Sequence, residues 1–592
     1  YKPLAQSERA HYSFSVKSDG SYDRALEIVY RILTAKGASS YASLDISYIP
    51  SKETLGPLNA WTVSPGGMRI AVADSAIRDR DEDNSGGSSN YSDTKYKSII
   101  YPDVAIGSLV GYRVKSHIHT ASYPGEFAKS FFFSPALQFK DWELNVTIPA
   151  PRKLYIESRG VNGGLVSSVD GISHYKFTYR RTTVIPPQHG AAGELHYADY
   201  LFVSTMPDMR ALGKIAKQFF AGKAEITPEI QALADSLVSG ESDERSKARA
   251  LYTWVAKNIR YVAISVGEGR LAPRPATKVL KNKYGDCKDH VVLLEALLSA
   301  AGIQSSPALI NSGTTHLFAK IGVHYPIDHA ITYIPSLDLY LDSTNRFVPF
   351  GTLPEEVVDK PVVLLNDGKI GRTPIVKAEE NVSVSDVSLE IQPDGSIKGN
   401  SSVTMTGHLE HYSRYSRFSS QSRHQPLVIK ALLERFNEAG TGSLTYTDPT
   451  AIDKPYRLVG QFILEPLTSM PGRGGLAFPI GLSPGFIYWA GMNSPAAEQR
   501  FPKTCTSQTY EDRISMTFPS NVEIEEIPKG VRFNQGGIRY ESRYKQSGRT
   551  VTAHRSLRVQ HASSVCGAKE HQEWKSFYRV LQRDVRAQII YR

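Results

Sequence analysis

A cysteine directly before an apolar helical run is the feature that most constrains how this chain can fold. Residues 284–290 read YGDCKDH, and the apolar residues of 291–301 recur with the period of a helix. Asp286 is a good N-cap, and Asp289 three residues later resembles the acidic partner of a capping box. Cys287 is therefore expected in the first turn of a buried helix, where the helix dipole and unpaired backbone N–H groups stabilise a thiolate. The alternative is a plain core residue, because free cysteine is among the most buried residue types.

A β-hairpin is predicted downstream, over residues 328–344. Two β-rich runs there are separated by a Pro-Ser turn. If the loop has two residues (336–337) or four (335–338), His329 faces position 344 and Asp342 is its diagonal neighbour on the same face. Side chains in that relation lie roughly 7–8 Å apart at the backbone and closer at their tips. His329 and Asp342 are thus expected within reach of a hydrogen bond.

Together these residues supply the three roles of nucleophilic acyl transfer. Cys287 would attack a carbonyl, His329 would take and return the proton, and Asp342 would fix the imidazole tautomer. Each residue also has a plain structural interpretation, a solvated strand histidine or a turn aspartate, but the joint pattern favours the catalytic one. A metal site built from the same three residues is disfavoured, since no second Cys or His ligand is nearby.

Several motifs resemble a known family. Residues 272–276, 279–289, 329–330, 341–344 and 348–354 are similar to the core of bacterial transglutaminase-like cysteine enzymes. Residues 16–22, 31–34, 91–94 and 106–113 resemble a β-rich domain of unknown function that commonly precedes that core in secreted bacterial proteins. The resemblance covers about the first 365 residues well, and the remainder only by domain order.

The resemblance implies a papain-like core with a Cys-His-Asp triad at Cys287, His329 and Asp342. Our leading hypothesis is a cysteine enzyme that acts on a peptide or protein substrate through a thioester on Cys287, with hydrolysis favoured and no cofactor or metal expected. Fold alone leaves the reaction open, so a cross-linking acyltransferase and a catalytically silent binding or scaffold protein of the cell envelope stay as alternatives. Asp328 differs from the uncharged residue, often Asn, that usually precedes the histidine, although strand alternation directs it to the opposite face.

The oxyanion donors are less defined by the sequence. The backbone N–H of Cys287 is the natural first donor at a helix start, and the hydroxyl of Tyr284 or Tyr261 could supply a second.

The length of 592 residues predicts about three domains. We expect an α+β fold with a β-rich N-terminal domain (1–190), a transglutaminase-like catalytic domain (200–365) and a mainly β C-terminal domain with one or more helices (375–592), the flanking domains being β-sandwich-like. Helices are predicted near 206–221, from 227, over 242–259 and over 426–439. An Asp-Gly-Ser turn between strands at 16–22 recurs at 391–397, which hints that the flanking domains are related.

Composition limits the partners. The net charge of +10 favours anionic surfaces, but lysine and arginine are scattered and no nucleic-acid-binding motif is present, so no nucleic-acid partner is expected. No apolar run reaches the length of a membrane span.

The three cysteines bear on the compartment. A bridge between Cys505 and Cys566 would leave Cys287 free, as suits an exported enzyme, whereas reduced and buried cysteines are the alternative. The chain begins at Tyr1, which we interpret as a mature form that has lost a signal peptide. The expected location is periplasmic or secreted.

Overall fold

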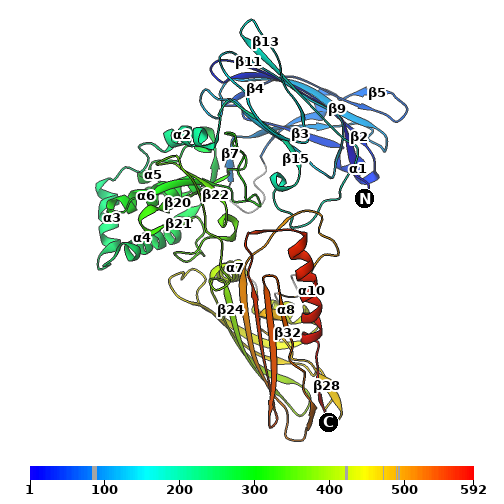
Figure 1. Cartoon of the computed structure of the whole chain (residues 1–592), viewed down its shortest axis with the longest axis vertical. Coiled ribbons are helices and arrows are strands. Elements are labelled where there is room, and N and C mark those ends of the chain that lie inside the picture. The colour runs from blue at the N-terminus through cyan, green and yellow to red at the C-terminus, as the bar shows by residue number, and fades with distance from the viewer. Residues whose placement is uncertain (83–89, 421–423, 471, 484, 488–489, 491–493) are drawn as a thin grey trace.

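The structure is a computed structural model that describes residues 1–82, 90–420, 424–470, 472–483, 485–487, 490 and 494–592. Figure 1 shows three successive parts: a β-rich N-terminal domain, a mixed α/β central domain and a C-terminal domain of long strands. Among the described residues, no helix is long and apolar enough to cross a membrane.

An eight-stranded sheet dominates the N-terminal domain, in the order β13-β14-β11-β1-β2-β9-β4-β5. β1 pairs in parallel with β11 and antiparallel with β2. Two three-stranded sheets, β10-β15-β12 and β3-β8-β6, bury its apolar face in two clusters. The elements are β1 (Ala5–Val16), β2 (Tyr22–Ile32), α1 (Ala35–Ser40), β3 (Ser43–Tyr48), β4 (Glu53–Val63), β5 (Arg69–Ala71), β6 (Ile77–Asp81), β7 (Asn90–Ser92), β8 (Lys95–Ile100), β9 (Leu109–Ile118), β10 (Ala128–Phe133), β11 (Gln138–Pro149), β12 (Tyr155–Arg159), β13 (Asn162–Val169), β14 (Ile172–Arg181) and β15 (Asp199–Ser204).

The central domain has five helices, of which α2 and α6 contact an antiparallel sheet in the order β21-β20-β19-β22-β23. Helix α6 lies in the middle, in contact with α3, α4, α5 and β20. The three helices predicted before it are confirmed, and each begins at a side-chain N-cap: Asp208, Thr227 and Asp243. The elements are α2 (Met209–Phe220), α3 (Pro228–Val238), α4 (Glu244–Asn258), β16 (Arg260–Tyr261), β17 (Ala263–Ser265), α5 (Ala276–Asn282), β18 (Tyr284–Gly285), α6 (Cys287–Ala300), β19 (Ser306–Ile310), β20 (His329–Ile334), β21 (Leu339–Leu341), β22 (Pro361–Leu364) and β23 (Ile370–Arg372).

Seven strands of the C-terminal sheet, read from the opposite edge, follow the strand order of the N-terminal sheet. The C-terminal sheet runs β26-β27-β25-β24-β30-β34-β33-β32, again with one parallel pair, β24 with β30, beside an antiparallel hairpin. Helices α8 and α10 and the sheet β28-β36-β31 cover the apolar face. The predicted helix over 426–439 is shorter than expected and ends at Glu434. The elements are β24 (Val382–Ile391), β25 (Ile397–Met405), α7 (Gly407–Ser419), α8 (Gln425–Glu434), β26 (Gly440–Tyr446), β27 (Tyr456–Leu464), β28 (Gly474–Leu476), β29 (Lys503–Thr504), β30 (Gln508–Thr517), β31 (Ile524–Glu526), β32 (Arg532–Gln535), β33 (Ile538–Ser547), β34 (Thr550–Val559), β35 (Val565–Cys566), α10 (Ala568–Val585) and β36 (Ile589–Tyr591).

The recurring Asp-Gly-Ser turn has the same structure in both sheets. The Ser21 N–H and hydroxyl donate to Asp19 at 2.9 and 2.6 Å, and those of Ser396 donate to Asp394 at 3.0 and 2.6 Å. Each turn contains a glycine at φ near +85°, a conformation that residues with a Cβ rarely adopt. The two flanking sheets therefore share both topology and turn chemistry.

Candidate active site

Cys287 is the first residue of α6, and the predicted capping box is confirmed. The Asp286 carboxylate accepts from the N–H groups of Lys288 (3.0 Å) and Asp289 (3.3 Å), while Asp289 accepts from the N–H of Asp286 at 3.0 Å. Arg274 holds the Asp289 carboxylate through its own N–H (2.7 Å) and its guanidinium. The helix start is thus fixed by charged groups, and the Cys287 side chain is 7% exposed at the positive end of the helix dipole.

The predicted hairpin has the four-residue loop and the expected register. Thr332 pairs with Leu341 and Ile334 with Leu339 across β20 and β21. His329 Nε2 lies 2.9 Å from Asp342 Oδ2, and Asp342 Oδ1 accepts from the N–H (3.0 Å) and hydroxyl (2.6 Å) of Thr344. The carboxylate is therefore held on both oxygens.

His329 connects the carboxylate to the thiol. The Cys287 thiol also interacts with the imidazole of His329. Burial would lower the pKa of His329, but the charge of Asp342, its hydrogen bond and Cys287 together raise that pKa well above the usual value. Burial would raise the pKa of Asp342, but the charge and hydrogen bond of His329 outweigh burial and lower that pKa. This electrostatic balance favours an imidazolium beside the sulfur.

A cation borders the thiol, and a second imidazole lies near His329 and Asp342. Lys288 Nζ lies 2.8 Å from Asp286, and despite its burial the charges of Cys287 and Asp286 raise the pKa of Lys288, which stays protonated. His290 is wholly buried, and burial lowers its pKa to about 4. The Ser343 backbone lies beside its ring, yet neither ring nitrogen meets hydrogen-bond geometry with any described group. Sequence reasoning missed His290, whose signal was its position three residues after Cys287 on the same side of a helix.

The two tyrosines named as oxyanion donors lie on paired short strands, β16 and β18. Tyr261 is 45% exposed. The partial burial of its side chain, followed by the charges of Cys287 and Asp286, raises its pKa. Its hydroxyl is therefore protonated near the nucleophile. Tyr284 instead lies beneath the guanidinium of Arg274, 5.2 Å from the ring centre. Tyr261 is therefore the better placed of the two.

Asp328 is directed away from the imidazole, as strand alternation predicts. Its carboxylate accepts from the N–H of Ser312 at 2.6 Å and from the Asn311 amide at 3.2 Å. It ties the strand start to a neighbouring loop.

The remaining cysteines form a disulfide, Cys505 to Cys566, which leaves Cys287 free. Within the described part of the chain, one group of side chains has the spacing of metal ligands, and it consists of these two cysteines and His561. Because the two sulfurs are bonded to each other, this group offers no thiolates to a metal.

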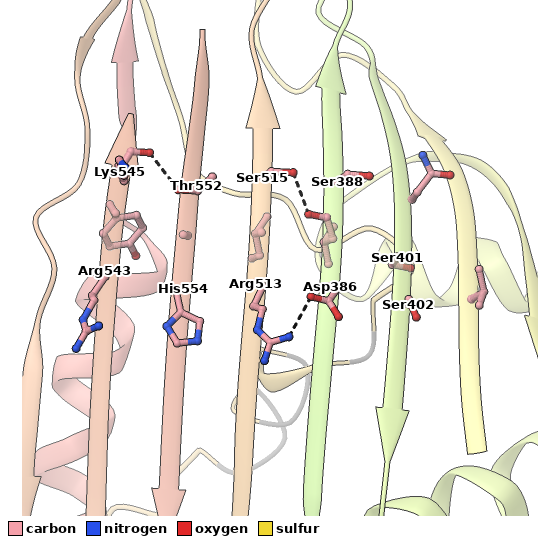
Figure 2. Close-up of a pocket in the computed structure, with 16 residues that line it drawn as sticks. Asp386, Ser388, Ser401, Ser402, Arg513, Ser515, Arg543, Lys545, Thr552 and His554 are labelled. Atoms are coloured by element: carbon pink, nitrogen blue, oxygen red, sulfur yellow. Dashed lines mark hydrogen bonds and ion pairs between the residues drawn. The ribbon is translucent and has the colours of Figure 1, made fainter. Parts of the chain in front are cut away.

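Two hollows lie away from the thiol, on the polar faces of the flanking sheets. The larger, of about 820 Å³, crosses the C-terminal sheet. Figure 2 shows Arg543, His554, Arg513 and Asp386 side by side there, and these residues pair directly across β33, β34, β30 and β24. The second, of about 600 Å³, crosses β11, β1, β2, β9 and β4 of the N-terminal sheet.

Three family models match successive parts of the chain. The transglutaminase-like superfamily core matches residues 231–314, the domain of unknown function DUF3857 matches 18–186, and the domain of unknown function DUF3858 matches 498–591. The chain carries a transglutaminase-like core. The predicted resemblance is thus confirmed, as is the α+β fold class with β-rich flanking domains. The transglutaminase-like match contains Cys287 and ends before His329 and Asp342, which the fold itself brings to the thiol.

A solved structure shares the architecture of the whole chain. A crystal structure from Parabacteroides distasonis, described as a "putative protease", covers 99% of both chains at 14% identity with a TM-score of 0.72. A "putative cysteine protease" from Cytophaga hutchinsonii covers 58% of this chain and 79% of its own at 12% identity, with a TM-score of 0.16, which carries no argument about fold. No curated protein matches the chain. The match to the transglutaminase-like superfamily, which includes Cys287, supports a cysteine enzyme.

Proposed function

We propose that this protein is a cysteine hydrolase that cleaves a peptide or amide bond through a thioester on Cys287. The observation that carries the proposal is the largely buried imidazole of His329, whose Nε2 lies 2.9 Å from Asp342 and which also interacts with the Cys287 thiol. This is the arrangement of nucleophile, base and orienting group that acyl transfer requires.

The first half-reaction forms the thioester. His329 already holds the proton of the thiol, and the thiolate of Cys287 attacks the carbonyl carbon, so that the negative charge moves to the carbonyl oxygen. The backbone N–H of Cys287 and the hydroxyl of Tyr261 would receive that charge. The tetrahedral intermediate then collapses, the C–N bond breaks, and His329 gives its proton to the leaving amine. The positive charge on His329 is stabilised throughout by Asp342.

The second half-reaction releases the acyl group. Water attacks the thioester carbon, His329 takes a proton from it, and the sulfur leaves as a thiolate beside the protonated imidazole. The acid product releases its remaining acidic proton to solvent and becomes a carboxylate. An amine in place of water would give a new amide, so the acyl acceptor decides between hydrolysis and cross-linking.

The test is acyl release from a library of peptides capped with a fluorogenic anilide, followed by mass spectrometry of the protein. We expect release of the aniline, a transient acyl adduct on Cys287, and loss of both in Cys287→Ala and His329→Ala. Including a primary amine separates the two acceptors, because hydrolysis gives the free acid and transfer gives the amide. Release that survives Cys287→Ala would overturn the proposal.

Export of the protein is part of the same proposal. The disulfide between Cys505 and Cys566 supports an oxidising compartment, periplasmic or extracellular, where peptide or protein substrates of the cell envelope are found. Labelling of free thiols in protein taken directly from its cells tests this. One reactive thiol per chain is expected, whereas three would contradict export.

A second candidate function, binding by the flanking sheets, is favoured by the hollow in Figure 2. Hydroxyl and charged side chains line it, with Ser388, Ser515 and Thr552 in one cross-strand row beside the charged row. Such a lining fits a hydroxyl-rich chain such as an oligosaccharide. Calorimetry with envelope glycans and with the variant Arg513→Ala tests it, and binding that Arg513→Ala leaves unchanged would exclude this face.

A further inference from the structure

The proposed catalytic Asp342 belongs to a closed loop, residues 342–348, whose two ends are held by one hydroxyl. Tyr252 of α4 is fully buried, and its hydroxyl lies 3.1 Å from the carbonyl of Asp342 and 3.0 Å from that of Val348. The Val348 N–H also donates to the carbonyl of Asn345 at 3.2 Å. The central domain therefore fixes where the loop starts and ends.

The middle of the loop is held by the C-terminal domain. Asn345 Oδ1 accepts from the N–H of Phe347 at 3.1 Å, which orients the amide so that Nδ2 faces His411 Nε2 at 2.7 Å. Burial lowers the pKa of His411, whereas Glu356, Asp342 and Glu355 oppose the shift. The imidazole is thus neutral, and its Nε2 lone pair is free to accept this hydrogen bond.

Helix α7 presents a whole face to this region, so the contact of His411 is not isolated. His408 Nε2 lies 2.9 Å from the carbonyl of Leu353. Phe347 packs on the rings of Tyr415 and Phe418, at 6.0 and 5.1 Å between centroids. Positions 408, 411, 415 and 418 are spaced by three and four residues, which places them on one side of the helix. The helix is docked along the loop rather than touching it at one point.

We propose that His411 is a positioning residue for Asp342. By accepting from Asn345, it fixes the loop that sets the Asp342 carboxylate against His329, so the C-terminal domain completes a site whose triad lies wholly in the central domain. This inference rests on the proposed function, in which Asp342 stabilises the charged form of His329. A contact that merely joined two domains would leave the reactivity of Cys287 unchanged.

The experiment compares full-length variants by the rate of Cys287 alkylation with iodoacetamide from pH 5 to 10, read by intact mass. His411→Ala is expected to slow alkylation at pH 7 by roughly tenfold, since misplacing a supporting group by an ångström can cost up to about a hundredfold, and to move the pH profile towards that of Asp342→Asn. His411→Gln keeps an acceptor near the same place and should restore most of the rate.

Two further variants separate positioning from folding. Tyr412→Ala changes the next residue of the same helix, whose side chain is 68% exposed, and should match the native profile. Asn345→Ala should reproduce His411→Ala, and the double variant should be no slower than either single one, because both remove the same hydrogen bond. Circular dichroism and thermal melts confirm that each variant is folded.

The outcomes distinguish this inference from the proposed function. A native profile that His329→Ala does not change would overturn the proposed function, whatever His411 does. A native profile that depends on His329 but stays the same in His411→Ala and Asn345→Ala would overturn only the positioning role. Equal losses in His411→Ala and His411→Gln, in step with a lower melting temperature, would show a purely structural contact and would also overturn it.

Discussion

At the scale of single residues, the pair of His329 and Asp342 governs how the site responds to pH. The folded-state pKa of His329 is raised and that of Asp342 is lowered, each by the charge of the other against the effect of burial. The ion pair therefore stabilises the folded state at pH values above the lowered pKa of Asp342 and below the raised pKa of His329. Its contribution is lost as the pH rises through that raised pKa.

Asp342→Asn should reveal this linkage. Without the carboxylate, burial dominates and the folded-state pKa of His329 falls, so the protonated imidazole becomes unfavourable. The loss of melting temperature relative to the native protein should be largest near pH 6, where His329 is also protonated in the unfolded chain, and should shrink towards pH 10. Thermal melts across this range check it, and a loss that grows with pH would contradict the assignment.

Tyr261 and Tyr284 can be separated by removing one hydroxyl at a time. Tyr261→Phe should lower acyl release by roughly 10- to 100-fold, because a donor to the oxyanion acts only when charge develops on the carbonyl oxygen. It should leave iodoacetamide alkylation unchanged, since that reaction forms no oxyanion. Tyr284→Phe is the matched control with little expected effect. Equal losses in the two variants would remove Tyr261 from the proposed oxyanion site.

At the scale of elements, the sequence predicts those whose pattern is local. The Asp286 and Asp289 caps, the helix after them and the hairpin carrying His329 all follow from short-range signals. Helices α7 and α10 were not predicted. α7 is rich in serine, histidine and tyrosine, which are modest helix formers, and its docked face meets another domain. The buried stripe of α10 includes His571 and Asp584, which interrupts the apolar period.

Asp584 on α10 provides a stability test of this element. Its carboxylate accepts from Tyr540 and Ser542 and pairs with Arg555 at 3.3 Å, with both charged side chains buried. Asp584→Ala should destabilise the C-terminal domain by about 3–5 kcal/mol, because it removes the ion-pair partner of a buried guanidinium. Urea unfolding followed by tryptophan fluorescence measures this. Glu541→Ala, which breaks exposed pairs, is the control, and equal midpoints for the two variants would contradict the account.

At the scale of the whole molecule, two sheets of the same topology flank a core that holds the thiol. The motifs around Cys287, His329 and Asp342 were sufficient to predict the three residues that the fold brings together. The contact between Asn345 and His411 could not be predicted, since it joins residues 66 apart across a domain boundary and no local pattern reports domain docking. The disulfide was left open, because spacing alone does not decide between a bridge and two thiols.

The disulfide should stabilise the C-terminal domain by closing a long loop. Cys505 and Cys566 are 61 residues apart, and a loop of that length corresponds to about 4 kcal/mol of unfolded-state entropy. The double variant Cys505→Ala with Cys566→Ala should lower the urea midpoint, and a reducing agent should lower that of the native protein equally. A native midpoint that is unaffected by reduction would contradict this.

The most direct test of the central claim, that Cys287 is a nucleophile paired with His329, is the pH dependence of its alkylation by iodoacetamide in the native protein and in His329→Ala. The account predicts fast labelling of the native protein well below the pH of about 8.5 at which a free thiol ionises, and loss of that low-pH reactivity in the variant. Labelling that rises only near pH 8.5 in both proteins would contradict it.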